Sequence, residues 1–134
     1  MKPLIPENIL QKNCKKINNR YAHLEYLNMK KLIDFTVTEN KRLNHDTILL
    51  VLHSDELPEI QPGQFVNVRV DHSPSTFLRR PISVHDVDES RGLLYLFIKI
   101  VGCGTSTLGE LQIGDKVNVM LPLGNHFSIP TSGR

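Results

Sequence analysis

The chain has 134 residues, enough for one domain but not two, since a domain of this size buries about two-thirds of its unfolded surface. Its net charge of +2, with acidic and basic residues interspersed, argues against a nucleic-acid-binding protein. Its cysteines, Cys14 and Cys103, form no C-x-x-C pair and its histidines show no ligand-like spacing, so no metal site is predicted and both thiols are expected to be free.

The N-terminal segment differs from the rest of the chain because it shows no sustained hydrophobic period. We expect residues 1–28 to be a disordered extension. This segment is basic, with Lys12, Lys15, Lys16 and Arg20, and it lacks the apolar core of a signal peptide or membrane anchor. A cytoplasmic protein without membrane contact is therefore expected.

From residue 29 onward, short runs rich in branched and aromatic residues alternate with turn signals. These runs predict six strands, at residues 32–39, 47–53, 65–70, 81–86, 93–101 and 116–121. Pro62–Gly63 fits the centre of a type II turn, Ser90–Gly92 closes a hairpin, and Gly114–Asp115 makes another tight turn. Because such short connections favour antiparallel pairing, we predict an all-β, six-stranded antiparallel barrel.

One short helix is predicted between the last two strands, from Thr105 to about Leu111. Thr105 or Ser106 is expected to be its N-cap, with Leu108 and Leu111 on the inward face. Gly109 weakens this helix by about 1 kcal/mol relative to alanine. The glycines just before the helix suit a binding site for phosphate, because backbone N–H groups at a helix start have no partner within the helix.

Arg80 is the strongest candidate for a binding residue. Pro81 pushes the backbone of Arg80 toward an extended conformation, from which its guanidinium can point sideways off a strand at a bound pyrophosphate. Ser83 shares a face with Pro81, so the two can line a flat ligand while Ile82 faces the other side. Two alternatives fit the spacing equally well: Arg80 pairs with a carboxylate such as Asp86 or Asp88, and Ile82 serves only core packing.

The predicted strand before the helix carries a second set of candidates. Phe97 and Lys99 share one face and Ile98 lies on the other, a half-buried pattern that needs no ligand. Lys99 either adds a positive charge to a cofactor site or is an ordinary solvated lysine. Gly104 and Thr105 either offer N–H groups to a phosphate or form an ordinary cap. No nucleophile–base pair or carboxylate dyad is evident, so redox chemistry carried by a cofactor fits better than hydrolysis.

Four segments occur in a distinctive order: Arg79–Ser83, Gly102–Thr105, Gly114–Val117 and Pro122–Asn125. Together they resemble the FAD-binding domain of the ferredoxin reductase superfamily, and most closely the electron transfer subunits of dihydroorotate dehydrogenases. The similarity runs from about Met29 to the end of the sequence. It implies a Greek-key barrel over residues 29–128 that binds FAD, and, at residues 129–134, the start of a linker to a C-terminal NAD-binding domain that this sequence lacks.

The resemblance also implies which residues contact the cofactor. They are Arg80, Pro81, Ile82, Ser83, Phe97, Ile98, Lys99, Gly104 and Thr105. No catalytic or metal-binding residue is implied. The sequence departs from the family pattern at Lys99, where arginine is frequent and lysine cannot form the same bidentate fork. Leu121 and His126 replace glycines often found near the end of the domain, in a turn that faces the flavin.

The implied function is that of an oxidoreductase component. Such a subunit passes electrons between NAD and the FMN-containing catalytic subunit of dihydroorotate dehydrogenase in pyrimidine biosynthesis, which predicts a hetero-oligomer. A [2Fe–2S] cluster and NAD are expected only in the full-length family proteins. Two alternatives stay open: a reductase module for another acceptor, such as a sulfur or hydrogenase complex, and a non-flavin barrel serving as an interaction module. The few aromatic residues and the near-neutral charge argue against an oligonucleotide-binding version of the latter.

Overall fold

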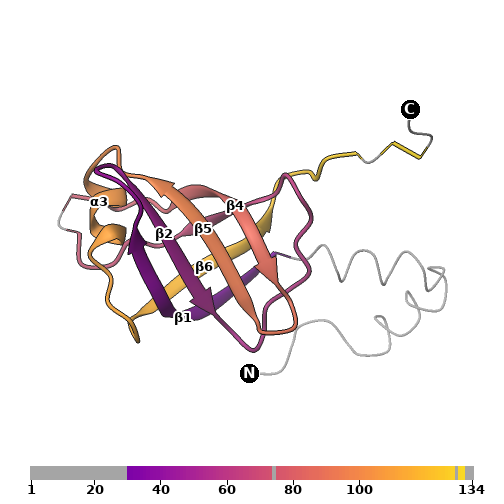
Figure 1. Cartoon of the computed structure of the whole chain (residues 1–134), viewed down its shortest axis with the longest axis horizontal. Coiled ribbons are helices and arrows are strands. Elements are labelled where there is room, and N and C mark those ends of the chain that lie inside the picture. Colours follow the sequence, from indigo (N-terminus) through magenta and orange to yellow (C-terminus); the bar gives the residue numbers. More distant parts are fainter. Residues whose placement is uncertain (1–29, 74, 129, 132–134) are drawn as a thin grey trace, which may run out of the picture.

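The computed structural model describes residues 30–73, 75–128 and 130–131. Within them, six antiparallel strands close into a barrel in the order β1–β2–β5–β4–β3–β6. Figure 1 shows the barrel, with α3 (Cys103–Gly109) at one end. The strands are β1 (Lys31–Arg42), β2 (Thr47–His53), β3 (Phe65–Val68), β4 (Arg80–Asp88), β5 (Leu93–Lys99) and β6 (Lys116–Leu123). The predicted all-β barrel is confirmed, whereas the prediction for residues 1–28 and most of that for 129–134 fall outside the described residues.

The connections give the barrel a Greek-key topology. Strands β3, β4 and β5 pair consecutively, and β6 then returns to lie beside β3. The connection from β5 to β6 contains the short helix α3 (Cys103–Gly109), and pairing of β6 with β1 closes the barrel. Within the described part of the chain, no helix is long and apolar enough to cross a lipid bilayer.

Except for β2, the elements begin or end one to three residues from their predicted bounds, and two of these differences have a clear structural cause. Strand β1 extends to Arg42 because an irregularity between Val37 and Glu39 lets it pair first with β6 and then with β2. Helix α3 begins at Cys103, with Gly102 as N-cap, so the prediction of Thr105 or Ser106 as N-cap was wrong.

The predicted turns are confirmed. Gly63 (φ 97°) has the positive φ that the third position of a type II turn requires, and Gly114 has a similar φ of 94°. In the β4–β5 hairpin, the N–H of Gly92 donates a hydrogen bond to the carbonyl of Glu89 (3.3 Å). These three tight connections determine where the strands around the candidate site begin and end.

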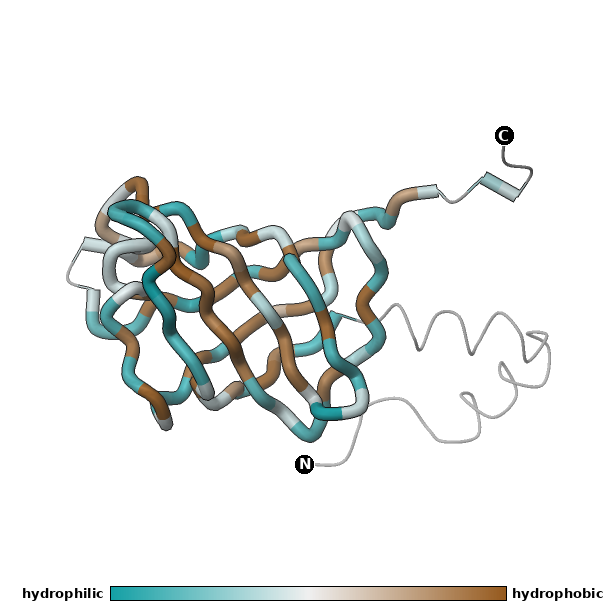
Figure 2. Tube along the Cα trace, in the orientation of Figure 1, coloured by the Kyte–Doolittle hydropathy of each residue, from teal (hydrophilic) through white to brown (hydrophobic). Residues whose placement is uncertain are grey.

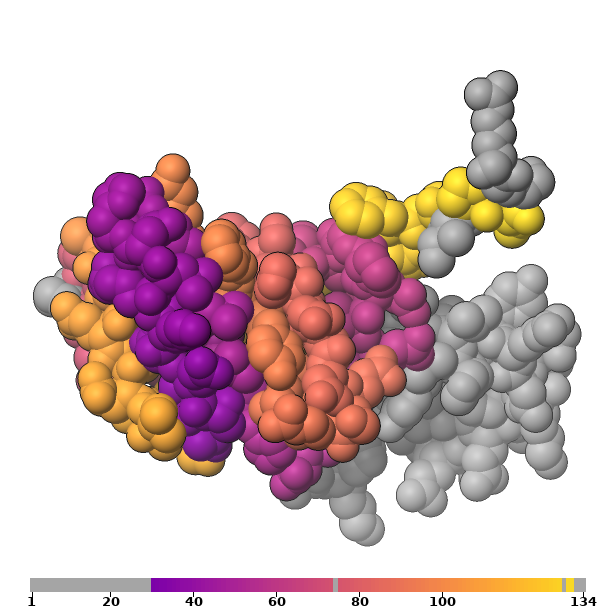
Figure 3. All heavy atoms as spheres, in the orientation of Figure 1, coloured from indigo at the N-terminus to yellow at the C-terminus, as the bar shows by residue number. Residues whose placement is uncertain are grey.

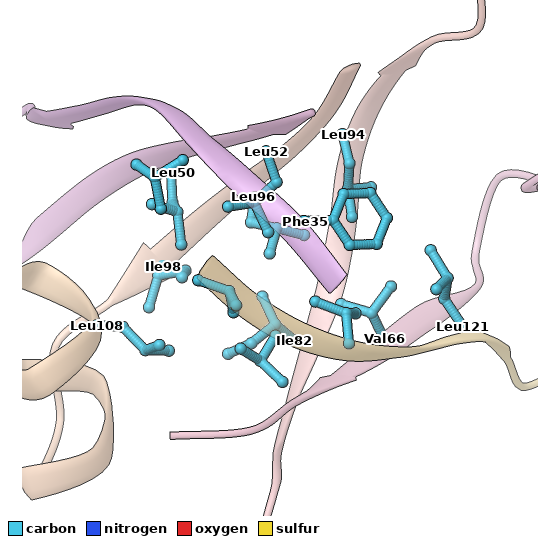
Figure 4. Packing of buried hydrophobic residues seen from close by; sticks show 14 of the residues in the cluster. Phe35, Leu50, Leu52, Val66, Ile82, Leu94, Leu96, Ile98, Leu108 and Leu121 are labelled. Atoms are coloured by element: carbon cyan, nitrogen blue, oxygen red, sulfur yellow. The ribbon is translucent and has the colours of Figure 1, made fainter. Parts of the chain in front are cut away.

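The core lies inside the barrel, where side chains from all six strands meet. Figure 2 shows the alternation of apolar and polar residues along the strands that this arrangement requires. The largest fully buried side chains are Phe35, Ile48, Leu50, Leu52, Leu94, Leu96, Ile98, Leu108 and Leu121, with Val37, Val66 and Val68. Many of them appear in Figure 4, which also shows Leu108 of α3 next to the end of the barrel where Ile98 lies.

Helix α3 is tied to the barrel by more than Leu108. The side-chain amide of Asn40 in β1 donates hydrogen bonds to the carbonyls of Leu108 (3.1 Å), Gly109 (3.2 Å) and Leu111 (2.9 Å). Carbonyls at the end of a helix lack partners within it, so one side chain satisfies several groups at once. Leu111 follows the helix instead of belonging to it, and it packs partly buried against the core, as expected for an inward-facing residue.

The contrast between buried and exposed leucines predicts a difference in stability. Leu96 is 0% exposed and Leu32 is 60% exposed. We expect Leu96→Ala to lower the free energy of unfolding by about 2–5 kcal/mol, because it removes core contacts and leaves a cavity. The matched control Leu32→Ala should change it by less than about 0.5 kcal/mol. Urea unfolding curves measure both, and equal effects would contradict the described barrel interior.

Candidate functional site

The candidate residues of β4 alternate between the outer face of the barrel and its core. Pro81 and Ser83 are exposed, whereas Ile82 between them is 8% exposed and belongs to the hydrophobic core. Of the two alternatives for the Ile82 side chain, the structure therefore favours core packing. Only the backbone of Ile82 is available to a ligand on the outer face.

The backbone of Arg80, at the start of β4, pairs with Val68 of β3, whereas its side chain has no ion pair or hydrogen bond with any residue that the structure describes. The carboxylates that could have paired with it are used locally. Asp86 accepts a hydrogen bond from the N–H of Val87 (2.8 Å), and Asp88 accepts bonds from the hydroxyl of Ser90 and the N–H of Arg91. The guanidinium donors of Arg80 are thus free to bind an anion.

Gly104 brings the first turn of α3 into contact with Arg80. A Cβ atom built on Gly104 would lie 2.7 Å from Nε of Arg80, closer than real Cβ contacts come. Gly104 is therefore the residue type that lets the helix backbone approach this side chain. The two predicted halves of an anion site, one in β4 and one in α3, are adjacent in the structure.

The same turn also leaves backbone donors without acceptors. The first hydrogen bond of α3 runs from the N–H of Ser106 to the carbonyl of Gly102 (2.9 Å). The N–H groups of Cys103, Gly104 and Thr105 precede this bond, so the helix offers them no carbonyl. Beside the free guanidinium of Arg80, they form a cluster of donors with no negative charge among them. Cys103 in this turn is an exposed free thiol.

The side chain of Thr105 shapes this turn. Its buried hydroxyl accepts hydrogen bonds from the N–H groups of Val101 (2.9 Å) and Gly102 (3.2 Å). Because both bonds lie just before the helix, they hold the glycine-containing turn in place. Of the two predicted roles for Thr105, the structure shows the local structural one, while its N–H stays available to a ligand.

On β5, Phe97 and Lys99 face outward and Ile98 faces the core, as predicted. The ring of Phe97 is 50% exposed, and its centroid lies 5.7 Å from that of His85 on β4. Strands β4 and β5 adjoin, and in Figure 3 their salmon and orange surfaces lie on one face of the molecule. Exposed aromatic and small polar side chains thus adjoin the anion-binding donors, a surface suited to a flat ring system.

Lys99 has a nearby carboxylate. Its ammonium lies 3.7 Å from Asp46, and its side chain is 69% exposed. The pKa of the Asp46 carboxyl is below its ordinary value, mainly because the Thr47 hydroxyl donates a hydrogen bond to it, with smaller contributions from the charges of His45 and Lys99. An exposed ion pair at this distance contributes little free energy, so Lys99 can exchange Asp46 for a ligand.

The two positions near the C-terminal end that depart from the family pattern differ in their environments. Leu121 is fully buried in the core and His126 is exposed. Next to His126 in the chain, the ring of Phe127 lies 3.0–3.1 Å from the position that a Cβ atom on Gly63 would take. The backbone N–H of Phe127 donates a hydrogen bond to the carbonyl of Pro62 (2.8 Å). The segment after β6 therefore runs along the Pro62–Gly63 turn, and Leu121 contributes to the barrel interior, not to the outer face.

Fold and site together define a barrel that binds a phosphate-bearing cofactor with a flat ring system, as flavin reductases do. The sequence profile of the family described as oxidoreductase FAD-binding domain matches residues 34–127. The chain belongs to this family, and its cofactor is FAD. The hypothesis of a non-flavin interaction module is therefore set aside.

Curated relatives identify a narrower similarity. The chain is 47% identical over 72 residues to the dihydroorotate dehydrogenase B (NAD(+)) electron transfer subunit of Desulforamulus reducens, a match covering 54% of this chain and 28% of that protein. It is 35% identical over 100 residues to the subunit of the same name from Fusobacterium nucleatum, covering 74% of this chain and 39% of that one. The chain thus spans well under half the length of these relatives.

Solved structures show the same barrel in several reductases. An NADH-dependent reduced ferredoxin-NADP oxidoreductase superimposes with a TM-score of 0.63 at 29% identity, covering 70% of this chain and 34% of that one. A ferredoxin reductase of carbazole 1,9a-dioxygenase gives a TM-score of 0.68 at 25% identity, covering 78% of this chain and 32% of the other. The barrel is thus one part of larger electron-transfer proteins.

The contact between Gly104 and Arg80 predicts the effect of a single methyl group. Gly104→Ala should displace the flexible Arg80 side chain and weaken FAD binding about tenfold or more, the scale of one charge-assisted hydrogen bond, with little change in melting temperature. Gly109→Ala, in the same helix but away from Arg80, is the matched control and should leave FAD affinity unchanged. Flavin fluorescence titration measures both, and equal affinities for the two variants would contradict the proximity of α3 and Arg80.

Proposed function

We propose that the chain is the FAD-binding part of an electron transfer subunit, passing electrons between NAD and the FMN-containing catalytic subunit of a dihydroorotate dehydrogenase. The observation that carries the proposal is the free guanidinium of Arg80 held against the Gly104 turn, on a barrel of the FAD-binding family. The names of the curated relatives support the choice of partner. The expected assembly is a hetero-oligomer with that catalytic subunit.

In this proposal, each candidate residue has a defined task. Arg80 and the N–H groups of Gly104 and Thr105 hold the pyrophosphate of FAD, because both supply hydrogen bonds to negative oxygens. Pro81 and Ser83 line the isoalloxazine from β4.

The remaining contacts come from β5 and from backbone. Phe97 and Lys99 contribute ring contact and positive charge, and Ile82 and Ile98 offer only backbone groups, because their side chains are in the core. When bound, FAD supplies the capacity to accept and release electrons, while the protein orients the ring and sets its surroundings.

The partner and the other redox steps concern the full-length family proteins. There, the NAD site and a [2Fe–2S] cluster are expected outside the FAD-binding barrel. FAD on the barrel would therefore be an intermediate carrier in a longer electron path, and the outer face of the barrel would lie between the NAD site and the [2Fe–2S] cluster. Its own contribution is to hold FAD in one orientation.

A reductase module for another acceptor is the second candidate function. The solved reductases that share the barrel include one acting with ferredoxin and one described as a cytochrome P450 reductase. Because the FAD site would be the same in either case, residues of the barrel do not separate the two candidates. The two candidate functions differ only in the protein that exchanges electrons with FAD.

Removing the guanidinium tests the cofactor site. Arg80→Ala should weaken FAD binding by about 1.5–3 kcal/mol, the contribution of a hydrogen bond to a charged group. Arg91→Ala removes an equal charge from the β4–β5 hairpin and serves as the control, with little effect expected. Calorimetric titration with FAD measures the change. Unaltered affinity in Arg80→Ala would refute the assignment of the pyrophosphate to Arg80.

The partner is tested by mixing the FAD-loaded chain with a dihydroorotate dehydrogenase B catalytic subunit. We expect co-elution in size-exclusion chromatography; reduction of FAD is not the readout, because the [2Fe–2S] cluster of the electron path is expected outside the barrel. Ferredoxin in place of the catalytic subunit is the comparison for the second candidate. Co-elution with ferredoxin alone would favour a reductase for another acceptor over the dihydroorotate dehydrogenase partner.

A further inference from the structure

The two consecutive arginines at the start of β4 have different surroundings. The guanidinium of Arg80 has no hydrogen-bond or ion-pair partner among the described residues, whereas the guanidinium of Arg79 is held by several acceptors. One nitrogen of Arg79 donates to the carbonyls of Asn67 (3.4 Å) and Asn118 (3.2 Å), and the other donates to the side-chain oxygen of Asn118. Arg79 thus binds protein groups of β3 and β6, and no negatively charged side chain accepts from it.

Asn118 links this contact to a third strand. Its side-chain N–H donates to the carboxylate of Asp34 in β1 (2.8 Å), its register partner across the β1–β6 pair. The backbone carbonyl of Asn118 also accepts a hydrogen bond from the backbone N–H of Arg69 (2.9 Å). Because the Asn118 amide is held by Asp34, its oxygen is oriented toward Arg79. The start of β4 is therefore connected through side chains to β3, β6 and β1.

The segment before β4 has few apolar anchors of its own. Phe77 is 93% exposed and Leu78 is 75% exposed, so neither packs against the barrel, and among the described residues of 71–78 only Thr76 is buried. The backbone of Arg80 pairs with Val68 of β3, and the hydrogen bonds of Arg79 anchor the residue immediately before it, where the ladder begins. A side chain can aim a guanidinium reproducibly only if its backbone is held in place.

We propose that Arg79 is a positioning residue. The hydrogen bonds that its guanidinium donates to Asn118 and Asn67 hold the backbone next to Arg80, and from there Arg80 reaches the pyrophosphate of FAD. This inference rests on the proposed function. It assigns the adjacent arginines different tasks: Arg80 contacts the cofactor, and Arg79 contacts only the protein. A lysine at position 79 would be a poor substitute, since a single ammonium cannot reproduce a planar fork with several acceptors.

A double-mutant cycle tests the proposal. FAD dissociation constants are compared for the wild type, Arg79→Met, Arg80→Met and the double variant. We expect Arg79→Met to weaken binding about fivefold to tenfold, and the double variant to bind as Arg80→Met does, because a residue that acts through Arg80 has no effect once Arg80 is gone. Arg69→Met, which removes a nearby exposed arginine paired with Asp71, is the control and should bind FAD as the wild type does.

The outcomes separate the possible failures. Losses that add in the double variant would mean that Arg79 contacts FAD directly, and unchanged binding in Arg79→Met would mean that it has no role in the site; either result overturns the inference. Unchanged binding in Arg80→Met would instead overturn the proposed function.

A second variant covers the case in which Arg79→Met does not fold. Asn118→Ala removes the amide acceptor but keeps the backbone carbonyl, and it should weaken FAD binding in the wild type yet not in Arg80→Met. A loss of equal size in both backgrounds would contradict the inference. Urea unfolding of each variant shows separately how far stability changes, and a purely structural role would change that stability without the coupling to Arg80.

Discussion

The candidate site depends on the contact between the side chain of Arg80 and the backbone of Gly104. Neither residue makes an anion site alone, and they come from different elements, β4 and α3. The barrel brings them together because β5 pairs with β4, and the chain leaving β5 enters α3 beside the start of β4. Asn40 and Leu108 then hold the helix against the barrel, so that core packing also fixes the position of the first turn of α3.

Successive side chains of a strand point to opposite faces, so β4 and β5 supply residues both to the core and to the outer face where FAD is proposed to bind. Ile82 and Ile98 complete the barrel interior, and Ser83 and Phe97 point outward from the neighbouring positions. A one-residue slip in register would exchange these roles and bury polar groups at high cost. Burial of the core side chains therefore fixes the strand register, and the register in turn fixes which residues face outward.

Much of this could be predicted from the sequence, because strands and turns are encoded locally. Strand β2 matches its predicted bounds, and the glycine turns follow from their backbone requirements. The prediction failed for one local contact and for one contact between distant residues. The N-cap was misplaced because the Thr105 hydroxyl bonds backward to Val101 and Gly102 in place of starting the helix. The link between Arg79 and Asn118, far apart in the sequence, has no local signal at all.

The two outward-facing cations of the candidate site should differ in how much they contribute to affinity. Arg80 exchanges only water for a phosphate, since no described carboxylate competes for it. Lys99 must leave Asp46, whose carboxyl pKa is held below its ordinary value mainly by the hydrogen bond from the Thr47 hydroxyl, and an exposed ion pair of this kind contributes little free energy. The exchange at Lys99 is thus nearly neutral in free energy. In the proposed site, affinity for the pyrophosphate would therefore be concentrated in Arg80 and the first turn of α3, so that fixing the backbone of Arg80 would matter more than adding another positive charge.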